Sequence, residues 1–373
     1  MRMRSKVALF LCLILVAVPA FAKDKPAPKD AIQSAKAPAW SLRASQSEMI
    51  VQVSPARQTL QILGSSAAVI GTSISAVVDE KYRRQVDEVL QGYDADKVFR
   101  ERLEARLNEV IGAKLKSVGA LTSTAGYSTP HDAAEARYAS LGKAGTDLIL
   151  DLKMTYGLFG YEGTLIAKLD GDLHETPSGH RVWNDTLVVS SEPILATDRL
   201  TDPTKMLSSN FSSPRLSVEE GAIAQWTGDG GKELRRRFEA AVDGVVSALL
   251  TDLGLVNEAI GDYYLGKVAM NRKDFDVAAE YFDKALALDP KYVDAQNGAS
   301  VNWAHAKNVD KAIAIAEEIL AANPEFGPAH FNLAWWYATA KKDAAKAKPH
   351  YDKALSLGLP QEKKIDKALN GKK

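Results

Sequence analysis

The chain has 373 residues, with 47 basic and 47 acidic side chains, so its formal net charge at neutral pH is zero. Charged residues make up 25% and apolar residues 46%, as in ordinary soluble globular proteins, and this balance argues against nucleic-acid binding. Because Cys12 is the only cysteine, the sequence after residue 22 excludes disulfides, thiolate catalysis and cysteine-based metal sites. The remaining length predicts two domains.

The first 22 residues have the features of a secretory signal peptide. Three basic residues precede an apolar run over residues 7–18, which is too short to span a bilayer comfortably. A small-x-small cleavage site follows at residues 20–22. We therefore expect export to the periplasm with cleavage after Ala22, the alternative being an uncleaved anchor. Without the three basic residues, the exported chain has a formal charge of −3.

The next segment, residues 23–45, is rich in Lys, Pro and Ala and has few apolar side chains, which predicts a flexible leader. From residue 46 to 255, alternating and helical patterns indicate a mixed α/β domain. Its first expected elements are a strand and two helical regions, at 48–53, 79–115 and 131–142.

The clearest strand pattern comes from three segments in which apolar and polar residues alternate, with Gly and Pro in the connections. These segments are 147–155, 165–173 and 180–190. They predict an antiparallel meander. Residues 193–217 are rich in Pro, Ser, Asp and Thr and predict a long surface loop, and residues 233–253 predict an amphipathic helix.

This order of elements, with residues 144–150 at a strand start and residues 176–183 in a turn and strand, resembles the N-terminal domain of TolB and the CsgG family. The resemblance implies a cell-envelope role without catalysis. Because the chain lacks the lipidated cysteine of the curli pore protein, no pore function is carried over.

A 34-residue period marks the C-terminal third, where three residues recur after that interval. The pairs are Ala278 and Ala312, Ala285 and Ile319, and Pro290 and Pro324. This stretch resembles the tetratricopeptide repeat (TPR) family, which implies stacked helical hairpins over residues 256–362. The three copies are 259–292, 293–326 and 327–360. The third copy matches if one residue is inserted near 341–343, and the lysine-rich tail, 363–373, contains part of a capping helix.

We therefore expect an α+β N-terminal domain, an antiparallel meander with helices, followed by an all-α array of TPR helical hairpins. In the TPR family the first helix of each repeat lines a concave face, which implies a groove for a protein or peptide partner. The partner-binding residues carried over are Tyr263, Lys267, Met270, Asn297, Val301, Phe331 and Trp335. The alternative is that Phe331 and Trp335 pack against a neighbouring helix or the N-terminal domain. The family's carboxylate clamp is not reproduced.

Motifs for catalysis are not recognisable in the sequence. The histidines lack metal-ligand spacing, the serines lack a Gly-x-Ser-x-Gly elbow, and residues 228–232 lack the framework of a phosphate loop. We expect no cofactor, no metal and no enzymatic activity. Residues 232–237 form a basic cluster, interpreted as a solvated helix face or, alternatively, a contact with anionic lipid or cell-wall polymer.

The functional hypothesis is a non-enzymatic periplasmic TPR scaffold that binds a protein or peptide partner, with the α/β domain docking to a cell-envelope component. One alternative is a membrane-associated assembly or secretion accessory protein. It rests on residues 58–78, an uncharged segment of 21 residues that would contact a membrane or another subunit. The other interpretation of this segment is a buried strand or helix end followed by a Gly/Ser loop. The other alternative is an unrecognised enzyme.

Overall fold

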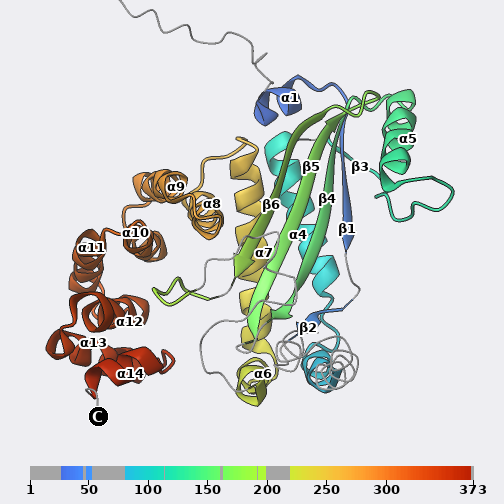
Figure 1. Cartoon of the computed structure of the whole chain (residues 1–373). Helices are drawn as coiled ribbons and strands as arrows, with labels where there is room; N and C mark the ends of the chain where they lie inside the picture. The colour runs from blue at the N-terminus through green and yellow to red at the C-terminus, as the bar shows by residue number, and fades with distance from the viewer. Residues whose placement is uncertain are drawn as a thin grey trace, which may run out of the picture.

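The computed structural model describes residues 27–44, 48–52, 80–112, 114–159, 163–190, 192–198 and 219–370. The predicted signal peptide and the uncharged segment 58–78 lie outside these residues. Figure 1 shows an α/β domain followed by a run of helical hairpins. None of the helices in the described ranges has the length and apolar character of a membrane span.

The α/β domain is built on a mixed sheet with the strand order β3-β1-β4-β5-β6, and β2 also pairs with β4. The strands are β1 (Pro38–Ala44), β2 (Ile50–Gln52), β3 (Lys116–Ser117), β4 (Leu148–Phe159), β5 (Thr164–Glu175) and β6 (Arg181–Ser190). The predicted antiparallel meander is confirmed for β4, β5 and β6. The sheet as a whole differs from the prediction, because β1 and β2 pair with β4 in parallel and β3 pairs with β1 in parallel.

The structure also differs from the expected flexible leader over residues 23–45. Residues 28–34 form helix α1 (Pro28–Ser34), residues 38–44 form β1, and Ile32 and Trp40 are buried. The backbone amides of Lys36 and Ala37 donate to the Asp147 carboxylate at 2.6 and 3.0 Å. The first five residues of β1 are all buried, so the strand lacks the alternation that reveals a half-exposed strand.

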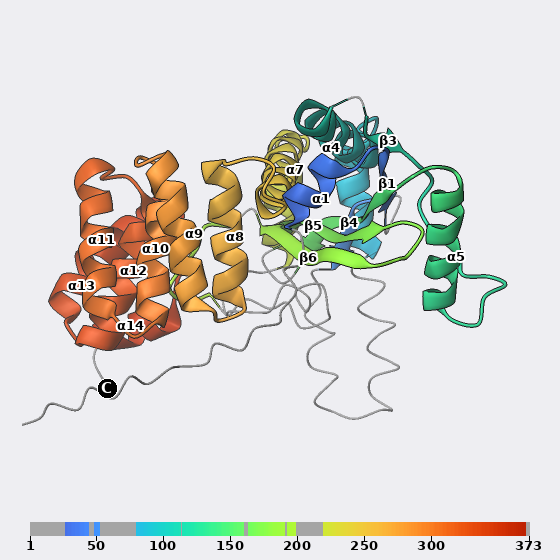
Figure 2. The same ribbon diagram turned by 90° about the horizontal axis from the view of Figure 1, so that it is seen from above.

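Helices cover both faces of the sheet. Figure 2 shows α4 (Ala95–Ile111) and α7 (Lys232–Asp252) together over one face, where they share the main core with β4, β5 and β6. Helix α5 (Pro130–Lys143) packs on the opposite face through Tyr138, which contacts Ala39 and Ile149. Residues 80–89 are also helical, and α6 (Glu219–Thr227) precedes α7.

The C-terminal region consists of antiparallel helical hairpins. The helices are α8 (Ala259–Asn271), α9 (Phe275–Leu288), α10 (Val293–His305), α11 (Val309–Ala322), α12 (Gly327–Trp336), the π-helical η2 (Tyr337–Lys341), α13 (Ala344–Ser356) and the capping helix α14 (Lys363–Leu369). Each hairpin turn has a lysine in the left-handed region, namely Lys273, Lys307 and Lys342. The next residue caps the second helix in each case, as Asp274, Asn308 and Asp343.

The one-residue insertion predicted in the third repeat lies in η2. In the first two turns the capping residue donates its amide to the fifth residue before it, Asp274 to Ala269 and Asn308 to Trp303. In the third turn Asp343 donates to Tyr337, one residue further back, at 2.8 Å. A π-helical turn accommodates one extra residue without breaking a helix, so the hairpin keeps its packing despite the longer sequence.

The two domains meet without a flexible linker, because α7 packs on the sheet and on α8. Close approach of α7 and α8 depends on Gly261, where an added Cβ would lie 2.1 Å from Thr251 Oγ1 and 2.9 Å from the Ser247 carbonyl oxygen. Beside this contact, Trp183 Nε1 on β6 donates to Asp252 Oδ2 at 2.8 Å.

Gly261→Ala should lower the free energy of unfolding by about 1–3 kcal/mol, because the added methyl group overpacks the contact between α7 and α8. Urea denaturation of the chain without residues 1–22 measures this. Gly221→Ala in α6 is the matched control, since an added Cβ there meets no atom within 4 Å. The control should be neutral or stabilising by up to about 1 kcal/mol. Equal destabilisation by both substitutions would contradict the packing argument.

The carboxyl group of Asp252 makes the domain junction sensitive to pH. Burial raises the pKa of Asp252 to about 6, the Asp185 carboxylate adds to the rise, and the Trp183 hydrogen bond and Arg272 oppose it. In the unfolded chain this pKa is about 4. The native state therefore binds the proton more tightly, so the stabilisation is complete below about pH 4 and is lost as the pH rises through about 6.

Asp252→Asn removes this titration and keeps an oxygen acceptor for Trp183. The variant should match the parent chain near about pH 4 and exceed its free energy of unfolding by up to about 3 kcal/mol above about pH 7. Urea denaturation across this range measures the difference. A difference that does not change with pH would rule out Asp252 as the responsible group.

Candidate functional site

A short segment of the α/β domain lies on the face formed by α8, α10 and α12, the first helices of the three hairpins. We call this surface the first-helix face and call residues 192–198 the bound segment. Figure 1 shows the chain leaving β6 and extending toward α10 and α12. Residues 193–198 were expected in a surface loop. Burial of Ile194 and Leu195 corrects that expectation for this part of it.

Two asparagines of the repeats hold the backbone of the bound segment. Asn297 Nδ2 donates to the Ile194 carbonyl at 2.8 Å, and Asn332 Oδ1 accepts from the Ala196 amide at 2.7 Å. The asparagines are themselves joined, since Asn332 Nδ2 donates to Asn297 Oδ1 at 2.9 Å. Both side chains are almost fully buried, so the hydrogen bonds form away from competing water.

The side chains of the bound segment fill the apolar surface beside these asparagines. Ile194 is 2% exposed and joins the repeat core, and Leu195 is fully buried with Phe331 and Ala354. A turn follows, in which Asp198 Oδ2 accepts from the Leu195 amide at 2.8 Å and its own amide donates to the Leu195 carbonyl at 3.0 Å. The first-helix face therefore binds a short stretch of backbone that leads into a turn, together with two adjacent aliphatic side chains.

A buried cation holds the start of the bound segment. Lys267 is 7% exposed, and its Nζ donates to Ser190 Oγ at 3.0 Å and to the Glu192 carbonyl at 3.2 Å. The rings of Tyr263 and Tyr264 lie 5.8 Å from the same nitrogen. These contacts fix the chain where it leaves β6, because a buried ammonium requires acceptors around it.

The seven predicted partner-binding residues occupy three different environments. Tyr263, Met270 and Val301 are buried in the repeat core. Lys267, Asn297 and Phe331 contact the same chain at Ser190 and Glu192, at Ile194, and at Leu195, respectively. Trp335 is half-buried and lines a pocket at the end of the array. Binding of an external partner by these residues stays a prediction.

Sequence reasoning missed Asn332 and the bound segment. Asn332 is fully buried in a helix whose neighbouring residues Leu333 and Ala334 are apolar, and a lone amide in such a run is the signal that was available. The adjacent Ile194 and Leu195 stand out in the same way at the start of a polar loop. Neither feature indicates that Asn332 and the bound segment contact each other, since the two lie far apart in the sequence.

Burial is the main cause of the pKa shifts of two histidines in the repeats, His305 and His350. Burial lowers the pKa of His305, opposed by Asp198. Burial also lowers the pKa of His350, and the adjacent His330 adds to that effect. Across the described ranges, no three side chains of His, Cys, Asp or Glu are grouped to hold a metal ion.

The stacked antiparallel hairpins define a helical-repeat protein. A family profile described as "Tetratricopeptide repeat" matches residues 263–325. The C-terminal region is therefore a TPR array, as the sequence predicted, and arrays of this class bind protein partners.

Two curated proteins show a weak sequence similarity to the chain. They are the 3-methyl-2-oxobutanoate hydroxymethyltransferases of Thermoanaerobacter sp. (strain X514) and of Thermoanaerobacter pseudethanolicus (strain ATCC 33223 / 39E). Each is 26% identical over 187 residues, which is 49% of this chain and 64% of the relative. The chain thus spans less than two thirds of their length.

Asn332→Ala should release the bound segment, because it leaves the Ala196 amide without an acceptor and removes a donor beside Asn297. We expect faster amide hydrogen exchange at Ala196 and a loss of about 1–3 kcal/mol in the free energy of unfolding. Hydrogen exchange and urea denaturation measure the two effects.

Gln296→Ala provides the control, since Gln296 Nε2 donates to the Pro290 carbonyl at an exposed position. That variant should leave exchange at Ala196 unchanged. If Asn332→Ala also leaves it unchanged, Asn332 does not hold the segment.

Proposed function

We propose that the protein is a non-enzymatic, exported scaffold whose TPR array binds an extended segment of a protein partner. The observation that carries this proposal is the bound segment, which occupies the first-helix face through backbone hydrogen bonds and two aliphatic side chains. The same surface has the chemistry to receive a similar segment from another chain.

Different contacts of the first-helix face would provide affinity for a partner segment and selectivity among such segments. Asn297 and Asn332 bind backbone atoms, which every sequence offers, so they tolerate many partners. The apolar surface around Phe331 selects side chains of the size of Ile194 and Leu195. A partner segment with two adjacent aliphatic residues in an extended conformation fits both requirements.

The bound segment sets the affinity that a partner needs. Burial of Ile194 and Leu195 contributes about 1.5–3 kcal/mol each. Because the segment is attached to β6, it also competes at a high effective concentration. A partner that replaces it must therefore bring more buried apolar surface or additional contacts, such as those offered beyond Phe331 toward Trp335.

The location in the envelope is part of the proposal. The basic residues, apolar run and small-residue cleavage site of the first 22 residues support export to the periplasm. The α/β domain would then dock to a second envelope component, as its resemblance to the TolB and CsgG families implies. Membrane contact through residues 58–78 remains an alternative for this second attachment.

The enzyme alternative has less support. The hydroxymethyltransferase relatives share 26% identity over about half of this chain. Asp252, whose carboxyl has a pKa raised by burial, is hydrogen-bonded to Trp183 at the domain junction. That arrangement accounts for its environment without a substrate.

Photocrosslinking in cells tests the proposal. A photoreactive amino acid at Trp335 should capture a partner protein, recovered with the exported chain from the periplasmic fraction, and Ile194→Asp with Leu195→Asp should increase the yield by vacating the first-helix face. The same probe at Leu288, which is 42% exposed on α9, is the control and should capture none.

Crosslinks confined to the chain itself, with and without the two aspartates, would contradict the scaffold proposal. They would mean that the first-helix face joins the two domains and has no external partner.

A further inference from the structure

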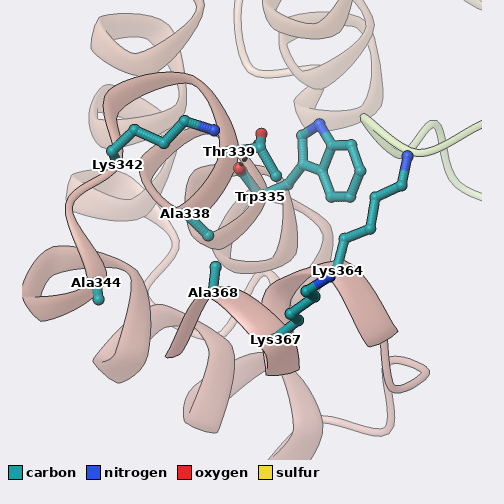
Figure 3. A pocket seen from close by; sticks show the side chains of 8 residues that line it. All are labelled: Trp335, Ala338, Thr339, Lys342, Ala344, Lys364, Lys367 and Ala368. Carbon is teal, nitrogen blue, oxygen red and sulfur yellow. Dashed lines mark hydrogen bonds between the residues drawn. The ribbon is translucent and has the colours of Figure 1, made fainter. Parts of the chain in front are cut away.

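A pocket of about 650 Å³ lies beyond the bound segment, at the C-terminal end of the array. The third hairpin contributes Trp335, Ala338, Thr339 and Lys342, and the capping helix α14 contributes Lys364 and Lys367. Figure 3 shows Trp335 and Lys364 beside each other, with Lys342 on the other side and small side chains between them. This volume is within the usual range of small-molecule sites.

The pocket follows from the extra residue of the third repeat. The π-helical turn η2 carries Ala338 and Thr339 and displaces Lys342 by one residue relative to the equivalent Lys273 and Lys307. Single π-helical turns are frequent at functional sites. Because the lining residues of η2 are small, α14 closes over them without filling the space.

The lining is both cationic and aromatic. Lys364 Nζ lies 5.4 Å from the centre of the Trp335 ring. The pocket has three lysines and no acidic residue among its lining side chains. Over the part of the chain that the structure describes, none of these three ammonium groups has a carboxylate within ion-pair distance. Nearby Lys341, by contrast, is paired with Asp310.

We propose that this pocket binds a small organic anion that carries an apolar ring. The ring would lie against the half-buried face of Trp335, and the anionic group would lie among Lys342, Lys364 and Lys367. Stacking on an indole favours a planar apolar group, and unpaired lysines favour a negative charge over a neutral or positive one. The pocket adjoins the first-helix face at Trp335, but binding of an anion there does not depend on the scaffold function.

Calorimetric titration of the exported chain with 2-naphthoate tests the proposal, with 2-naphthalenemethanol as the neutral analogue of the same ring. We expect 2-naphthoate to bind at one saturable site, with an affinity that falls as salt is added. The neutral analogue should bind at least about tenfold more weakly.

Four variants locate the site. Lys364→Gln with Lys367→Gln should weaken 2-naphthoate binding about tenfold, since two exposed charges are removed. Ala368→Phe should abolish binding by filling the space while Trp335 remains, and Trp335→Ala should weaken binding by loss of the ring contact. Lys291→Gln is the control, an exposed lysine in the turn between α9 and α10, and should bind like the parent chain.

Three results would overturn the proposal. These are no saturable binding up to about 1 mM, equal affinity for the neutral analogue, or unchanged affinity after the double lysine substitution. Thermal denaturation of each variant separates loss of the site from loss of the fold, and the exposed lysine variants keep the test valid if Trp335→Ala does not fold.

Discussion

Helix α7 is the element on which the arrangement of the whole chain depends, because it is buried on two sides. One side covers the sheet through residues such as Phe238 and Val242, and the other meets α8 where Gly261 permits contact with Thr251. A helix with one apolar stripe leaves its other side to water, whereas α7 joins two cores. The α/β domain and the repeats are therefore held in a fixed relation by packing rather than by a linker.

That fixed relation determines where the chain goes after β6. The strand ends next to α8, and Lys267 holds Ser190 and the Glu192 carbonyl there. Two residues beyond Glu192, the Ile194 carbonyl accepts from Asn297, and the Ala196 amide donates to Asn332. The first-helix face is thus filled by the chain that leaves β6, and Asn297 and Asn332 find backbone hydrogen-bond partners in it. The same contacts that join the domains are those that would receive a partner.

The parts of the fold that the sequence predicted are those with a regular spacing of residue types. The 34-residue interval located the hairpins, and alternation located β4, β5 and β6. The misfit in the third copy predicted one extra residue near 341–343, and the π-helical turn that accommodates it, Tyr337–Lys341, lies just before most of that stretch. Strand β1 was missed because a strand buried on both faces has no alternation. The environment of Asn297 was missed for a different reason. Its hydrogen bond to Ile194 joins residues 103 positions apart, and no local pattern encodes such a pairing.

The array therefore has two surfaces with different physical demands on a ligand. On the first-helix face, a newcomer must outcompete a tethered segment whose apolar side chains are already buried, so binding there requires a large gain in buried surface. In the pocket between η2 and α14, the lysines are exposed and the space is open, so a ligand has only its own desolvation and ordering to overcome. Trp335 borders the pocket and follows Phe331 by one helical turn on α12. A ligand seated against Trp335 thus lies one helical turn from Phe331, which packs with Leu195 of the bound segment, so helix α12 connects the open surface to the filled one.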